Sequence, residues 1–211
     1  MLELAPGNGE LLVRLLAAHP GARATGIDRS PWFLRNARQR AVELGVADRI
    51  ELRDEDATRV SWPIDAVDLA IAVGAAGILG DHAGTVAALA RMARPGGGLV
   101  LFGDGVWTGE PPADGLAAFG MERGELPEGL AGQQALGAAA ALAPLWSELV
   151  TVEEWDDYES AYGSMVEPWA AANPEDRDRD AFIARTALMR KSYADWRRDS
   201  FGFGITLFRR P

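Results

Sequence analysis

The chain contains no cysteine and only two histidines, His19 and His82. Without cysteine it has no disulfide, no cysteine-ligated zinc or iron–sulfur cluster, and no thiol nucleophile. Two histidines are too few for a multi-histidine metal centre. We therefore expect no metal site.

Positive charge and long apolar runs are also scarce. Lys and Arg number 21 against 31 for Asp and Glu, which gives a net charge of −10, and a field of this sign repels phosphate backbones and anionic headgroups. The longest apolar run, residues 130–145, is interrupted by Gly, Gln and Pro and falls short of the roughly 20 residues that span a bilayer. No signal-peptide pattern opens the sequence. We expect a cytoplasmic protein that binds neither nucleic acid nor membranes.

The sequence does contain a regular alternation of strand-like and helix-like segments over its first half. With 211 residues, 48% of them apolar, it is long enough for one domain over residues 1–211. The strands are expected at residues 1–4, 22–27, 49–52, 67–73 and 99–102, and the helices at 10–19, 31–44 and 84–93. This alternation predicts an α/β fold with a doubly wound, mostly parallel sheet, whose ligands gather at the carboxyl ends of the strands.

The second half is less regular. Residues 103–112 are rich in Gly and Pro and are expected to form a loop, followed by a helix near 130–142 and a strand at 145–150. Thr151 and Glu154 form a capping box at the start of a helix, and a second helix is expected at about 180–198. Residues 151–198 are therefore predicted to be a helical insertion or lid before a final strand at 201–208.

Four turns that follow predicted strands carry small or acidic residues. Residues 3–10 read Glu-Leu-Ala-Pro-Gly-Asn-Gly-Glu, and Asp28 follows Gly7 by 21 residues, close to the spacing at which an acidic side chain accepts hydrogen bonds from ribose hydroxyls. Asp56-Ala57 follows the third strand and Gly74 the fourth. Because the strands are parallel, all four turns are expected at one edge of the sheet, although a glycine turn alone can be a plain tight turn.

This ordered set of motifs resembles that of the class I S-adenosylmethionine-dependent methyltransferases over residues 1–105, which would then be the cofactor-binding half. The resemblance implies S-adenosyl-L-methionine as cofactor and a seventh, antiparallel strand inserted between strands five and six of a Rossmann-like sheet. It places Glu3, Ala5, Gly7 and Gly9 along the methionine and ribose portions of the cofactor. Asp28 is similar to the residue that holds the ribose diol, and Asp56 and Ala57 to the pair beside the adenine; Arg29 and Gly74 complete the expected cofactor set.

The sequence departs from the family pattern in three places. Ala5 stands where the first glycine of the loop is usual, and the given sequence starts inside the expected first strand, whereas family members normally carry a helical segment before this motif. The fourth strand lacks both the Asn/Asp-Pro-Pro-aromatic motif of amino-directed DNA and protein methyltransferases and the aspartate of magnesium-dependent catechol-type members. We therefore expect a small-molecule acceptor.

Methyl transfer from a sulfonium is a direct displacement, so aligning the acceptor and excluding water matter most, and a general base is optional. His82 is the only histidine placed to act as a catalytic base, although a solvated residue at a helix start is an alternative. Trp107, Tyr158 and Tyr162 are candidates for the acceptor pocket, and packed core positions are the alternative for all three.

Two other functions remain open at this point. One is an NAD(P)-dependent oxidoreductase, although Glu10, Leu11 and Leu12 follow Gly9 where its fingerprint needs a further small residue. The other is a cofactor-binding module without catalysis. If Asp28 holds a ribose, Asp28→Ala is expected to weaken cofactor binding while leaving folding nearly unchanged.

Overall fold

The computed structural model describes all 211 residues, which form two compact units. Unit 1 consists of Met1–Asp104, Leu130–Glu148 and Ile205–Pro211. Unit 2 consists of Gly105–Gly129 and Leu149–Gly204.

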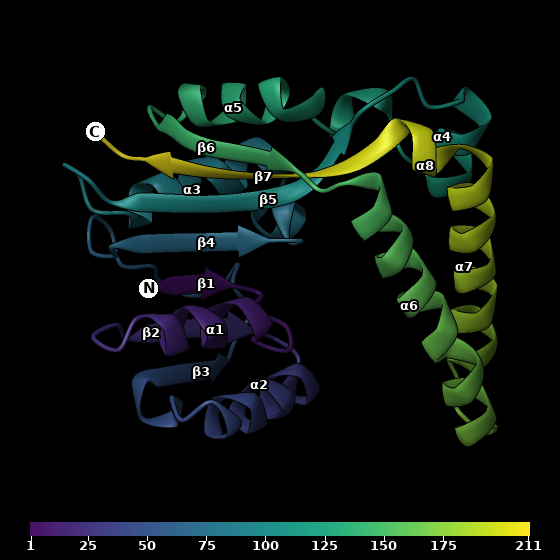
Figure 1. Cartoon of the computed structure of the whole chain (residues 1–211), viewed down its shortest axis with the longest axis horizontal. Helices are drawn as coiled ribbons and strands as arrows, with labels where there is room; N and C mark the ends of the chain where they lie inside the picture. Colours follow the sequence, from purple (N-terminus) through teal and green to yellow (C-terminus); the bar gives the residue numbers. More distant parts are fainter. The chain divides into compact units, whose positions relative to one another are not determined.

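Seven strands form one sheet in the order β3-β2-β1-β4-β5-β7-β6 (Figure 1). Their bounds are β1 Leu2–Leu4, β2 Ala24–Asp28, β3 Ile50–Asp54, β4 Leu69–Val73, β5 Leu99–Trp107, β6 Ala143–Leu149 and β7 Phe201–Arg209. Strand β1 pairs in parallel with β2 and β4, β2 with β3, and β4 with β5, whereas β7 is antiparallel. This order confirms the predicted mostly parallel, Rossmann-like sheet and its antiparallel last strand.

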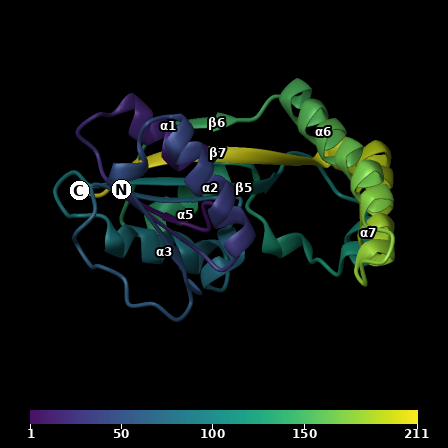
Figure 2. The same cartoon turned by 90° about the horizontal axis from the view of Figure 1, so that it is seen from below.

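Helices cover both faces of the sheet in unit 1. They are α1 Glu10–Ala18, α2 Pro31–Glu43, α3 His82–Met92 and α5 Gly129–Ala139, with short 3-10 turns η1 Ala47–Arg49 and η2 Ala76–Leu79. Leu12 and Leu16 of α1 pack in one core cluster with Ile71, and Val86 of α3 packs in another with Phe102. Figure 2 accordingly shows α1 and α3 on opposite sides of the sheet.

Local sequence signals explain where α2 begins. The Ser30 hydroxyl oxygen accepts a hydrogen bond from the Phe33 N–H at 3.4 Å, and Pro31 occupies the first helical position, where its missing N–H costs nothing. Because α2 starts directly after β2, the turn at residues 28–30 is held at the carboxyl end of that strand.

Unit 2 is mainly helical. It contains α4 Ala113–Phe119, η3 Arg123–Glu125, α6 Val152–Ala172, α7 Arg179–Ser192, a π-helical turn η4 Tyr193–Arg197 and α8 Arg198–Ser200. The Thr151 and Glu154 capping box is present at the start of α6. Helices α6 and α7 lie side by side (Figure 1), and the buried Glu159 carboxylate accepts a hydrogen bond from Arg197 at 2.7 Å. The expected helices at 151–198 are thus found, and their role as a lid stays a prediction.

The largest difference from the expected elements lies after residue 102. The predicted loop begins too early, because β5 continues to Trp107, and α4 was not expected. Gly105 explains the error: a Cβ at this position would lie 2.7 Å from the Phe201 ring. This glycine makes room for an aromatic side chain that is remote in sequence, and it does not mark a turn. No helix combines the length and apolar character needed to cross a membrane.

Candidate functional site

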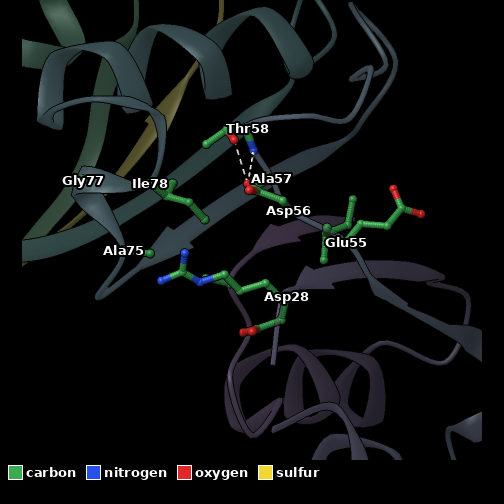
Figure 3. Close-up of a pocket in the computed structure, with 11 residues that line it drawn as sticks. Asp28, Glu55, Asp56, Ala57, Thr58, Ala75, Gly77 and Ile78 are labelled. Carbon is green, nitrogen blue, oxygen red and sulfur yellow. Dashed lines mark hydrogen bonds between the residues drawn. The ribbon is translucent and has the colours of Figure 1, made fainter. Parts of the chain in front are cut away.

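A cavity of about 570 Å³ opens in unit 1 at the carboxyl ends of β2, β3 and β4 (Figure 3). Its size falls in the range of small-molecule and cofactor sites. Eleven residues line it, namely Ala5, Ile27, Asp28, Arg29, Glu55, Asp56, Ala57, Thr58, Ala75, Gly77 and Ile78. Five of these residues were predicted to bind the cofactor: Ala5, Asp28, Arg29, Asp56 and Ala57.

Asp28 is the last residue of β2 and only 9% of its surface is exposed. Its Oδ2 accepts the Gly7 N–H at 3.0 Å and its Oδ1 accepts the Ser30 N–H at 2.9 Å. The side chain thus ties the β1–α1 loop to the start of α2. This dual role corrects the expectation that replacing Asp28 leaves folding nearly unchanged, because two backbone donors would lose their acceptor.

The β1–α1 loop needs left-handed backbone conformations at its small residues. Ala5, Gly7 and Gly9 have φ angles of 51°, 54° and 71°, a region that glycine adopts freely and alanine rarely. A Cβ on Gly9 would also lie 2.7 Å from the Cβ of Ala37 in α2. Gly9 therefore allows α1 and α2 to approach closely, while Ala5 lines the cavity.

Asp56 is fixed by a short turn of its own. Its Oδ1 accepts hydrogen bonds from the Thr58 N–H at 2.9 Å and the Thr58 hydroxyl at 2.7 Å, drawn as dashed lines in Figure 3. The hydrogen bond from the Thr58 hydroxyl lowers the pKa of Asp56. The cavity wall therefore contains an ionised carboxylate whose orientation is set before any ligand arrives.

Glu3 lies in the middle of β1, is only 3% exposed, and its Oε2 is buried without a hydrogen-bond partner. Burial raises the pKa of Glu3 to about 8. An unpartnered carboxyl group in a protein interior is unusual, and this one lies two residues before the cavity-lining Ala5.

At the carboxyl end of β4, Gly74 has a φ of 69° and leads into Ala75 and the η2 turn. This turn is held by Asp104, which is not among the predicted site residues. The Asp104 Oδ2 accepts the Ala76 N–H at 2.6 Å, and the Thr85 hydroxyl donates to the Ala76 carbonyl at 2.6 Å. The only sequence signal for Asp104 is its position just after the predicted fifth strand, within residues 103–112, which the sequence predicts to be a loop.

His82 is the first residue of α3, and its ring meets Phe102 edge to face at a centroid distance of 6.0 Å. Its Nε2 is buried and has no hydrogen-bond partner. His82 does not line the cavity described above. Its role as a base stays a prediction.

The three expected acceptor residues lie in unit 2. Trp107 is only 2% exposed, and its indole N–H donates to the Arg123 carbonyl at 2.8 Å. Tyr158 is 57% exposed and stacks on Trp155, with ring centroids 5.2 Å apart, and on Tyr162 at 6.4 Å. Trp155, Tyr158 and Tyr162, which we call the aromatic row, thus form a continuous stack on α6, whereas Trp107 has the contacts of a packed anchor.

Six cavity residues were absent from the predicted set: Ile27, Glu55, Thr58, Ala75, Gly77 and Ile78. Ile27, Glu55, Thr58 and Ala75 each adjoin a predicted position, whereas Gly77 and Ile78 lie further along the chain, in η2. The side-chain types of these six residues carry no signal on their own.

Comparison with known proteins identifies the family. A family model for a methyltransferase domain matches residues 1–97. The chain is 33% identical to the Escherichia coli (strain K12) protein YjhP over 208 residues, which cover 97% of this chain and 82% of YjhP. The demethylmenaquinone methyltransferase of Thermus thermophilus is 34% identical over 122 residues, 57% of this chain and 51% of that enzyme.

A solved structure agrees with these matches. The S-adenosylmethionine-dependent methyltransferase of Geobacter sulfurreducens in complex with S-adenosyl-L-homocysteine is 32% identical, and its TM-score is 0.88 with 100% of this chain and 84% of that chain covered. These findings favour a methyltransferase over an NAD(P)-dependent oxidoreductase and over a module without catalysis. The chain belongs to the S-adenosylmethionine-dependent methyltransferases and uses S-adenosyl-L-methionine as its cofactor.

Proposed function

We propose that the enzyme methylates a small-molecule acceptor, that the cavity of unit 1 holds the cofactor, and that the aromatic row of unit 2 contacts the acceptor. The observation that carries the cofactor assignment is the convergence of Asp28 and Asp56 on one cavity, from the ends of two neighbouring strands. In a doubly wound sheet this edge is where ligands bind.

The residues of the cavity suit the chemistry of the cofactor. When bound, S-adenosyl-L-methionine supplies an electrophilic methyl group on a sulfonium. Asp28 is placed to accept hydrogen bonds from the ribose hydroxyls, since each carboxylate oxygen has a second lone pair besides the one used for a backbone N–H. Asp56 and Ala57 are placed beside the adenine, and the buried carboxyl of Glu3 is available to a cationic group.

The aromatic row supports a role in acceptor binding. Tyr158 presents more than half of its surface to solvent although its ring is held by stacking on both sides. A ring fixed in this way loses little freedom when it contacts a ligand, which favours an acceptor with an apolar or planar part. The Thermus thermophilus relative is named for a small molecule, demethylmenaquinone, which also supports a small-molecule acceptor.

His82 is proposed as the base for an acceptor that must lose a proton. Its Nε2 is buried and has no protein hydrogen-bond partner, so an acceptor would have to reach this atom to lose its proton there. Alignment of the acceptor, and not proton removal, is expected to supply most of the rate, so His82→Ala should lower turnover by less than the ~10²–10⁴-fold typical of a lost general base.

The proposal is tested by incubating the enzyme with S-adenosyl-L-methionine and a panel of small molecules, and by following methylated product by mass spectrometry. Tyr158→Ala should raise the KM of a methylated acceptor about fivefold, the equivalent of roughly 1 kcal/mol for one aromatic contact. The Kd of S-adenosyl-L-homocysteine should not change. Met165→Ala is the matched control, because Met165 is 61% exposed on the same helix and is not part of the aromatic row.

Two results would contradict the proposal. If Tyr158→Ala and Met165→Ala both keep the parent KM, the aromatic row does not contact the acceptor. If Tyr158→Ala instead weakens cofactor binding, the division of roles between the two units is wrong.

A further inference from the structure

The starting observation is that Glu3 is buried in β1 and that one of its carboxyl oxygens has no hydrogen-bond partner. Its side chain extends from β1, opposite Gly26 of β2 and Ile71 of β4, neither of which has a polar side chain. Its Oε2 is buried without a hydrogen-bond partner. A carboxylate in this position would lose its hydration and gain no compensating contact, which disfavours the charged form.

The charged groups on the elements that pack against β1 are all engaged elsewhere or exposed. Strand β4 has none, Asp28 of β2 accepts the N–H groups of two other residues, and on α1 Glu10 and Arg14 form an exposed ion pair. Burial is the only cause of the raised pKa of Glu3, and no neighbouring charge contributes to it. Burial therefore favours the neutral form of Glu3 in the free protein at pH 7.

Cofactor binding would change this environment. S-adenosyl-L-methionine has a cationic α-ammonium group, a cationic sulfonium and an anionic α-carboxylate, and its demethylated product keeps the α-ammonium and the α-carboxylate. An opposite charge within a few ångströms in a site of low dielectric favours the ionised carboxylate strongly. We propose that Glu3 ionises when the cofactor binds, so that binding expels the Glu3 proton to solvent and the new carboxylate offsets the positive charge of the ligand.

The inference rests on the proposed placement of the cofactor in unit 1. It implies that cofactor binding is coupled to the release of one proton from Glu3. The reaction is protein–COOH plus ligand giving protein–COO⁻ paired with the α-ammonium of the bound ligand, plus one H⁺ in solution. With a pKa of about 8, about 0.9 of the Glu3 side chains are protonated at pH 7 and about 0.1 at pH 9. Affinity for the ligand should accordingly rise about ninefold from pH 6 to pH 7.

The proton release can be counted by titration calorimetry of the unmodified protein with S-adenosyl-L-homocysteine, in buffers of equal pH but different ionisation enthalpy. The α-ammonium of the ligand is more basic than a peptide N-terminus and is almost fully protonated at pH 7, and contact with a carboxylate favours that form further, so it adds little to the proton count at this pH. The difference between the parent protein and Glu3→Gln therefore isolates Glu3. Glu10→Gln is the matched control, since it makes the same substitution at an exposed carboxylate on the adjacent helix.

The parent protein and Glu10→Gln should release about 0.9 more protons than Glu3→Gln at pH 7. Equal proton release by the parent and Glu3→Gln would overturn the inference while leaving the cofactor site intact. If Glu3→Gln does not fold, the Kd of the parent protein at pH 6 and pH 7 decides: a ninefold change supports the inference and an unchanged Kd refutes it. No binding at either pH would instead refute the placement of the cofactor, and the inference with it.

Discussion

Asp28→Ala should damage both the fold and the cofactor site, and the two effects can be separated. The substitution removes the acceptors of the Gly7 and Ser30 N–H groups. Two partly buried donors that lose their acceptors cost about 1–3 kcal/mol of unfolding free energy in total, since water reaches part of this region. For a chain of this length that loss corresponds to a fall in Tm of about 2–12 °C.

Cofactor binding should weaken in addition. Loss of hydrogen bonds between a carboxylate and the ribose hydroxyls costs about 1.5–3 kcal/mol, or a Kd raised about 10- to 150-fold. Asp28→Asn keeps one carbonyl oxygen, so it should retain one of the two backbone contacts and give intermediate values for both measurements. Urea denaturation gives the free energy of unfolding. Calorimetry with S-adenosyl-L-homocysteine gives the Kd, at a temperature well below the Tm of each variant.

The control for Asp28 is Asp54→Ala. Asp54 is the last residue of β3, pairs in register with Asp28, is exposed, and does not line the cavity. Asp54→Ala should leave both the Kd and the Tm close to the parent values. An unchanged Kd in folded Asp28→Ala, or equal weakening in the two variants, would refute the assigned role of Asp28.

Three further predictions concern stability. Glu3 binds its proton more tightly in the folded state, where its pKa is about 8 against 4.5 in the unfolded chain, so the free energy of unfolding should fall as pH rises from 5 to 8. Glu3→Gln removes this loss, and its free energy of unfolding at pH 7, measured by urea denaturation, should exceed that of the parent by about 3 kcal/mol. Gly9→Ala should lower stability by about 1–3 kcal/mol, because its Cβ would collide with Ala37 at a positive φ, and a Tm equal to the parent's would contradict this. Arg197→Ala should cost about 3–5 kcal/mol by leaving Glu159 buried and unpaired, whereas replacing both by apolar residues should cost less.

The elements of unit 1 could be predicted because each is specified locally. Strand β4 is a short apolar run, as expected for a strand covered on both faces, and α2 has its cap at Ser30 and its proline at the first position. The same holds for the capping box at Thr151 in unit 2. Such signals depend on neighbours in sequence, so no tertiary information was needed.

The sequence predictions fail where a residue is required by a contact with a part of the chain that is remote in sequence. Gly105 lies in a glycine-rich stretch that predicts a turn, but it belongs to β5, where the Phe201 ring occupies the space that a side chain would need. Asp104 was assigned to a loop for the same reason, although its carboxylate holds the Ala76 N–H at the cavity. In both cases the partner is remote in sequence, and composition cannot reveal it.

The carboxyl groups of the candidate site differ in a way that the sequence could not show. Asp56 already receives two hydrogen bonds from Thr58, so its charge is stabilised and its oxygens are oriented before a ligand binds. Glu3 receives none at its buried Oε2, and in the proposed scheme its charge forms only when a cationic group binds. A fixed, ionised carboxylate accepts hydrogen bonds from neutral hydroxyl and amino donors without any cost of ionisation on binding. A neutral buried acid discriminates between cationic and neutral ligands, because only a cationic group offsets the free energy needed to ionise the acid.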